Sequence, residues 1–191
     1  MKRKQKAQRK LWIILMAVVL AIAVSFGIFL VAQRVSYPLK YQDQIEQMAR
    51  KYDLEPSLIF GVIHTESRMN PQAVSPVGAV GLMQIMPDTG QWIAQKLNWE
   101  DFEEEQLKMP EKNLELGCWY LRYLLDRFDA DINAVLAGYN AGPNRVAQWL
   151  QNEAYTTNGK LTTIPNKDAE QYVERVLHAK EKYQSLYKVD Y

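Results

Sequence analysis

The hydrophobic pattern divides the chain into one long apolar run and a longer region of helical periodicity. Residues 11–32 contain no charged residue, and this run of 22 is long enough to cross a bilayer as a helix. Beyond it, apolar residues recur every three or four positions, the spacing of helices that bury one face. The sequence therefore predicts an all-α domain behind one N-terminal transmembrane helix.

Helix-start signals divide the domain further. Proline favours the first turn of a helix, and Pro56 therefore opens one that follows an earlier helix near residues 41–52. Asp88 and Asp131 can each cap a helix. Further helices are expected from about Pro110 to Phe128, beyond residues 142–143 and after residue 165. Residues 70–87 are rich in Pro, Gly and Ser and predict an extended loop, with at most a small β-hairpin.

Charge is distributed unevenly along the chain. Residues 1–34 carry seven basic and no acidic residues, whereas residues 35–191 carry 16 basic and 22 acidic residues, a net charge of −6. The positive-inside rule then predicts a single-pass protein of the bacterial cell membrane, with a cytoplasmic N-terminus and an extracytoplasmic domain. The apolar run exceeds the about 7–15 residues of a signal-peptide core, which favours an uncleaved signal-anchor. We expect a basic tail (1–10), an anchor (11–32), a short linker (33–40) and one domain (41–191).

The same composition argues against several classes of function. A net-acidic domain does not suit nucleic-acid binding, which depends on lysine and arginine neutralising phosphates. One cysteine, Cys118, excludes an internal disulfide and a thiolate-cluster zinc site, and two histidines leave few metal ligands. We expect no metal and no cofactor, and we expect Cys118 to be a core residue.

One carboxylate stands out because it follows an apolar helical segment. Glu66 lies four residues after Val62 and so on the face that the apolar residues occupy. Burial would raise its pKa, and a carboxyl that is partly protonated near neutrality suits a general acid for glycosidic-bond cleavage. From helix position alone, an ordinary solvated glutamate at a helix end is the better interpretation.

Four motifs change that judgement. The sequence contains Glu-Ser at 66–67, Ser-Pro-Val-Gly-Ala at 75–79, Gly-Leu-Met-Gln at 81–84 with a proline at 87, and Tyr-Asn-Ala-Gly at 139–142. In this order and spacing they resemble the transglycosylase domain of the soluble lytic transglycosylase type, family 1, which has a goose-type-lysozyme-like fold. The resemblance covers about residues 41–187.

The resemblance implies a substrate and a reaction. The substrate is the glycan strand of peptidoglycan, cut between N-acetylmuramic acid (MurNAc) and N-acetylglucosamine (GlcNAc) without water. The C6 hydroxyl of MurNAc attacks its own C1 and leaves a 1,6-anhydro ring. Glu66 matches the single catalytic acid, which protonates the leaving oxygen and then accepts the hydroxyl proton. An intramolecular nucleophile also accounts for the absence of a second carboxylate from the motifs.

Other matches imply substrate-binding roles. Ser75 corresponds to a serine that binds substrate near the acid, Gln84 and Met86 to residues of the sugar cleft, and Tyr139 to a tyrosine that orients the acid, with Asn140 beside it. Each has a purely structural alternative: Ser75 could start a turn, Gln84 could bond loop backbone, Met86 could fill core, and Tyr139 could be a buried tyrosine.

The sequence departs from the family before the last helix. Where the family has Glu and Arg, this chain has Asp168 and Glu170. The shorter Asp168 puts the usual sugar contact in doubt, and we expect it to cap the helix, with a secondary part in binding. Three rival functions remain: a lysozyme-type hydrolase on the same fold, a non-catalytic wall-binding or scaffold protein, and a membrane-tethered helical adaptor.

Overall fold

The computed structural model describes residues 2–189, with the side chains of residues 2–9 and 11 left out. The chain forms two compact units, Met1–Leu39 and Lys40–Tyr191. The first contains a single helix, α1 (Lys2–Ser36). Within it, Trp12–Ser36 is apolar enough to cross a membrane, with a mean hydropathy of 3.0, and its apolar side chains are exposed. The predicted anchor lies within α1, whereas the side chains of the predicted basic tail, apart from Lys10, lie outside the described part.

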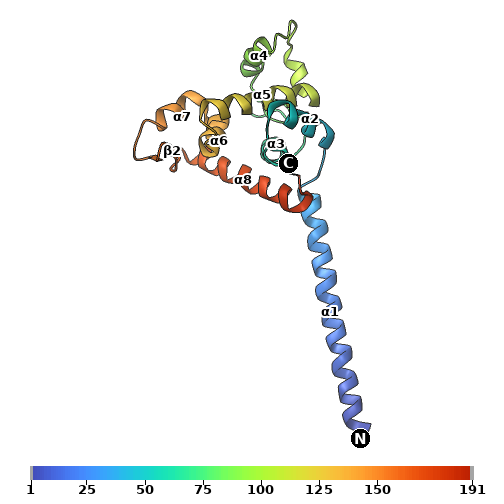
Figure 1. The fold of residues 1–191 in the computed structure, drawn as a ribbon. Helices are drawn as coiled ribbons and strands as arrows, with labels where there is room; N and C mark the ends of the chain where they lie inside the picture. The colour runs from blue at the N-terminus through green and yellow to red at the C-terminus, as the bar shows by residue number, and fades with distance from the viewer. Residues whose placement is uncertain (1, 190–191) are drawn as a thin grey trace. The chain divides into compact units, whose positions relative to one another are not determined.

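The second unit is almost entirely helical, as the periodicity predicts (Figure 1). Its helices, in chain order, are α2 (Gln42–Tyr52), α3 (Pro56–Ser67), α4 (Pro87–Lys96), the 3₁₀ helix η1 (Glu104–Lys108), α5 (Pro110–Arg127), α6 (Ile132–Ala141), α7 (Pro143–Trp149) and α8 (Lys167–Tyr187). Two short strands, β1 (Thr156–Thr157) and β2 (Lys160–Leu161), lie between α7 and α8.

Helix α3 occupies the centre of this unit. Every residue from Pro56 to Ile63 is buried, and α3 packs along α8, which also packs against α6 (Figure 1). Gly61 makes this close approach possible, because a Cβ there would lie 2.8 Å from the carbonyl oxygen of Val176. The middle of α3 therefore lies directly against the backbone of α8.

The helix starts largely follow the expected signals. Asp131 is confirmed as the N-cap of α6, because its side chain accepts hydrogen bonds from the backbone N–H groups of Asn133 and Ala134. The predicted cap at Asp88 is wrong, since α4 begins at Pro87 and its N-cap is Met86. Proline presets the backbone angle of the first helical residue, so α4 begins at Pro87 and Asp88 lies inside the helix, one position too late to cap it.

The β-hairpin lies in a different place from the one predicted. Residues 70–87 contain isolated bridges from Val80 to Val74 and Ile85, whereas the paired strands are β1 and β2. Asn158 and Gly159 connect these strands with φ angles of 52° and 76°, the conformation that favours Asn-Gly in two-residue hairpin loops. The hairpin is tied to α6, because the Leu161 N–H donates to Asp131 Oδ2 at 2.6 Å.

Candidate active site

Glu66 lies in the last turn of α3, immediately before the chain leaves the helix. Arg68 and Met69 both have positive φ angles, 51° and 64°, and they turn the backbone into the loop that follows. The side chain of Glu66 is partly buried, and burial raises its pKa from 4.5 to about 7. The hydrogen bond from Tyr172 and the charge of Arg175 act in the opposite direction but do not offset the burial.

Tyr172 of α8 fixes one oxygen of this carboxyl group. Its hydroxyl donates to Glu66 Oε1 at 2.7 Å, and its side chain is only 2% exposed. Burial and the adjacent Glu66 carboxylate raise the Tyr172 pKa well above 10, so the phenol stays protonated and remains a donor. The Tyr172 hydroxyl therefore holds the Glu66 carboxyl group in place through Oε1.

Tyr139 of α6 contributes to the same site through the backbone of the loop. Its hydroxyl donates to the Met83 carbonyl oxygen at 2.9 Å, within the Gly-Leu-Met-Gln motif. Burial, followed by the negative charge of Glu66, raises the Tyr139 pKa well above 10. The structure thus brings Tyr139 into the electrostatic environment of Glu66, with its hydroxyl proton already engaged by the loop.

The Gly-Leu-Met-Gln loop is held by a buried amide. Asn113 is fully buried, accepts from the Met83 N–H at 2.7 Å, and donates to the carbonyl oxygens of Val80 and Leu107 at 2.9 and 2.8 Å. Gly81 is required beside it, because a Cβ there would lie 2.1 Å from the Leu107 carbonyl oxygen. These contacts tie the loop to α5.

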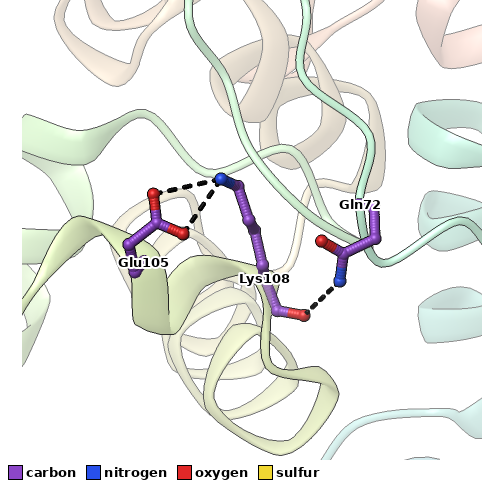
Figure 2. A network of polar contacts seen from close by, with 3 residues as sticks. All are labelled: Gln72, Glu105 and Lys108. Carbon is purple, nitrogen blue, oxygen red and sulfur yellow. Dashed lines mark hydrogen bonds and ion pairs between the residues drawn. The ribbon is translucent and has the colours of Figure 1, made fainter.

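A second set of polar contacts ties the beginning of the loop to η1. Figure 2 shows the Gln72 amide donating to the Lys108 carbonyl oxygen at 3.3 Å, while Lys108 Nζ pairs with both Glu105 carboxylate oxygens. Gln72 and Glu105 are exposed, so each contact contributes little to stability. Their effect is to hold the loop end of residues 70–73 near η1.

Two of the predicted binding residues have their hydrogen-bonding groups directed into the loop itself. Ser75 Oγ accepts from the Ala79 N–H at 2.9 Å, as in a serine-initiated turn. The Gln84 amide donates to the carbonyl oxygens of Ala73 and Gly81 at 3.1 and 2.9 Å. These contacts match the structural alternatives, because Ser75 Oγ and the Gln84 side-chain nitrogen both bond backbone groups of the loop.

The other predicted binding residues are more exposed. Met86 is 41% exposed at the start of α4, and Asn140 is exposed next to Tyr139. Asp168 is exposed in the first turn of α8, and the expected cap is wrong: Asn166 is the N-cap and accepts from the Ala169 N–H at 2.8 Å. Asparagine caps as well as aspartate and lies one position before the helix begins, where a cap is needed.

The sequence reasoning missed Tyr172 and Arg175 as site residues. Tyr172 has the helical spacing of a core residue of α8, whereas its hydroxyl contacts Glu66, 106 positions earlier. Cys118 is fully buried, as predicted, and burial raises the pKa of its thiol. Within the described residues, no cluster of three or more His, Cys, Asp or Glu side chains is placed to hold a metal.

Comparison with known proteins agrees with this geometry. The family described as transglycosylase SLT domain matches residues 43–161, and this chain belongs to that family. The soluble lytic murein transglycosylase of Salmonella typhimurium is 37% identical over 144 residues, which are 74% of this chain and 22% of that protein. The membrane-bound lytic murein transglycosylase C of Actinobacillus pleuropneumoniae is 30% identical over 166 residues, covering 75% of this chain and 46% of that protein.

The fold is shared with a solved relative as well. The lytic transglycosylase Slt of Pseudomonas aeruginosa, solved as an inactive mutant, superposes with a TM-score of 0.75 and 31% sequence identity. The match covers 83% of this chain and 26% of that structure. The chain thus spans about a quarter of the length of the Salmonella typhimurium and Pseudomonas aeruginosa proteins.

Proposed function

We propose that this protein is a membrane-anchored peptidoglycan lytic transglycosylase in which Glu66 is the only acid and base. The observation that carries the proposal is the Glu66 carboxyl group, with its pKa raised to about 7 and Oε1 held by Tyr172. Near neutral pH such a group is present in both protonation states. It can therefore donate a proton in one step and accept one in the next.

The reaction needs two proton transfers and no water. Protonated Glu66 gives its proton to the oxygen that joins MurNAc C1 to GlcNAc, and the C1–O bond breaks. The N-acetyl group of MurNAc assists at C1. The Glu66 carboxylate then removes the proton of the MurNAc C6 hydroxyl as that oxygen bonds to C1. The 1,6-anhydro ring closes, and Glu66 ends in its starting form.

The surroundings of Glu66 support a mechanism with one carboxylate. A two-carboxylate glycosidase needs a second carboxyl group about 5–9.5 Å from the first. Among the described residues, the groups that set the Glu66 pKa besides burial are Tyr172 and Arg175, with no carboxylate among them. Asp168, at the family's glutamate position, is exposed on the first turn of α8.

The substrate and location are supported by the relatives and the N-terminal helix. Several relatives are named murein transglycosylases, and one group of them is named as membrane-bound. The Trp12–Ser36 span and the basic residues before it favour a single pass with the N-terminus in the cytoplasm. The catalytic domain then lies on the outer side, where glycan strands are within reach.

The products of digestion test this proposal. Full-length protein in detergent is incubated with purified glycan strands, and the released muropeptides are analysed by mass. We expect MurNAc ends that lack one water, as required by a 1,6-anhydro ring. Products with ordinary reducing ends would instead identify a lysozyme-type hydrolase, and intact strands would indicate a binding protein.

A further inference from the structure

A cavity of about 410 Å³ lies at the opposite end of α3 from Glu66. Its apolar floor includes Leu58 in the first turn of α3 and Leu177 of α8. Arg122 of α5 and Lys180 of α8 form part of its wall, and none of the residues that line it is aromatic. Its volume is within the range of about 300–1,000 Å³ of small-ligand sites, and its lining suits an aliphatic group better than a sugar ring.

The distance between the cavity and the acid is set by two packed helices. Glu66 contacts Tyr172, whereas Gly61 approaches the Lys180 backbone so closely that a Cβ there would lie 3.0 Å from its nitrogen. Helices α3 and α8 therefore run in opposite directions, and Leu58 is eight residues from Glu66 just as Lys180 is eight from Tyr172. At about 1.5 Å per residue, the cavity lies about 12 Å from the acid along both helices.

The charged side chains around the cavity lie at two levels. Those of Lys180 and Arg122 are only 20% and 30% exposed. Lys180 pairs with Glu55, and Arg122 pairs with Asp126 and donates to the Asp53 carbonyl oxygen at 3.3 Å. The three acidic side chains are between 60% and 100% exposed. The mouth of the cavity is therefore acidic, above cations that lie lower in its wall.

Asp53 is the acid best placed to meet an incoming cation. Its side chain is fully exposed, and its Oδ2 lies 3.8 Å from Arg122 Nη1, beyond hydrogen-bond distance. Arg122 and Lys180 have closer carboxylate partners, which an incoming anion would have to displace. A cation can bind Asp53 without displacing any of these contacts. The cavity therefore suits a ligand with an aliphatic body and an ammonium group.

We propose that this cavity binds the peptide stem of peptidoglycan, with the side chain of the stem's diamino acid on the apolar floor and its amine at Asp53. The stem is attached to MurNAc, is rich in alanine, and carries a primary amine wherever it is not cross-linked. An extended peptide spans about 3.3–3.6 Å per residue, so a stem of about four or five residues covers the distance from the acid. Lys180 and Arg122 offset the repulsion between the stem's carboxylates and the acidic mouth. This inference rests on the proposed function, because the stem belongs to the strand that is cut at Glu66.

A stem that is not attached to a strand should bind weakly. An exposed ion pair changes affinity by no more than about fivefold, and the apolar contact area is small, so we expect a Kd of the order of 1 mM. When the strand is held at Glu66, its own stem is present at a millimolar effective concentration, which is enough to occupy such a site. Strands that carry stems should therefore bind more tightly than bare strands.

The cavity is tested first without cleavage, by methyl NMR of the full-length protein in detergent. The probe is the tetrapeptide L-Ala-γ-D-Glu-L-Lys-D-Ala, and the same peptide acetylated at the lysine amine is titrated beside it. We expect saturable shifts of the Leu54, Leu58 and Ile132 methyl groups, which belong to the cavity lining. Acetylation should raise the Kd by about two- to fivefold, because the ion pair is lost.

Two variants and a control relate this binding to the cavity. Asp53→Asn should raise the Kd by about two- to fivefold, and asparagine tolerates the positive φ of 50° at this position. Leu177→Gln, which places a polar group on the half-buried floor, should raise it by about fivefold or more. Asp43→Asn is the matched control, because Asp43 is exposed in the first turn of α2 and does not line the cavity. It should leave the Kd unchanged.

Three results would overturn the assignment. They are no methyl shift in the cavity at about 10 mM peptide, about ten times the expected Kd, and a Kd that neither Asp53→Asn nor acetylation changes. The third is equal binding of the all-L peptide acetyl-Ala-Leu-Lys-amide, which would make the occupant a basic protein segment instead of a stem.

Cleavage then tests the stem on the substrate itself. Native protein is given glycan strands that carry stems and strands from which an amidase has removed them. We expect a lower KM for the stem-bearing strands, and Asp53→Asn should raise that KM by about two- to fivefold without a matching change in kcat, whereas Asp43→Asn should not. A KM that is equal for both kinds of strand would overturn the inference. Absence of anhydro products from native protein would instead refute the proposed function, and the NMR titration would still decide whether the cavity binds the stem.

Discussion

Replacing Glu66 by glutamine is expected to make the folded protein more stable at neutral and alkaline pH. Burial raises the Glu66 pKa to about 7, which means that the folded state favours the protonated carboxyl group. Above that pH the carboxylate ionises in an environment that does not suit it. Glutamine has nearly the same shape and remains neutral at every pH, so the variant avoids this cost.

The size of the effect follows from the pKa. A change from 4.5 to about 7 corresponds to about 3 kcal/mol at about 1.36 kcal/mol per pH unit. Glu66 is partly exposed, and solvent screening reduces this to about 2 kcal/mol. The Glu66 contribution is fully present below pH 4.5, and it is lost as the pH rises through about 7. The free energies of unfolding of variant and native protein should diverge over that interval.

Thermal unfolding of the full-length protein in detergent, followed by circular dichroism from pH 4 to pH 9, measures the difference. For a domain of this size, about 2 kcal/mol corresponds to a midpoint about 4–8 °C higher for Glu66→Gln at pH 9, and to no difference at pH 4. Glu170→Gln is the matched control, because Glu170 is exposed in the first turn of α8 and should show no such divergence. If the difference in unfolding midpoint between Glu66→Gln and native protein stays constant or decreases as the pH rises, the burial of an ionisable carboxyl group is refuted.

Three further changes test the structure around the site. Tyr172→Phe removes the hydroxyl donor that favours ionised Glu66, so the Glu66 pKa should rise further. The alkaline limb of the pH–rate profile for glycan-strand cleavage should then move to higher pH, and a limb that does not move would exclude the contact. Asn113→Leu removes three buried hydrogen bonds and should lower the free energy of unfolding by about 2–4 kcal/mol in denaturant titration. Asn166→Ala should lower the free energy of unfolding by about 0.5–2 kcal/mol, because the helix loses its cap, and Asp168→Ala should lower it clearly less. If Asp168→Ala instead has the lower melting midpoint of the two variants, Asp168 is the cap.

The helical framework could be predicted because its signals are local. Prolines at the first turns of α3 and α5, and the Asp131 cap, mark helix starts within a few residues of where they occur. The hairpin was also within reach: Asn158-Gly159 is a strong two-residue turn signal. It was overlooked because the flanking strands are only two residues long, too short to show an alternating pattern.

The motifs pointed to Glu66 but not to the residues that surround it. The partner of its carboxyl group, Tyr172, comes from a helix more than a hundred positions later, and the helical spacing of Tyr172 is that of a core residue. Asn113 likewise reads as a polar residue in an amphipathic helix, although it is fully buried and holds the loop. Such contacts depend on how helices pack, which periodicity alone does not specify.

In the proposed reaction Glu66 makes both proton transfers. This role is tested most directly by the rate at which full-length Glu66→Gln releases anhydro-muropeptides from purified glycan strands, with native protein and Glu170→Gln beside it. We expect a loss of about 10²–10⁴-fold for Glu66→Gln, the contribution of general acid–base catalysis, and a near-native rate for Glu170→Gln. Release of anhydro products by Glu66→Gln at a near-native rate would contradict the account.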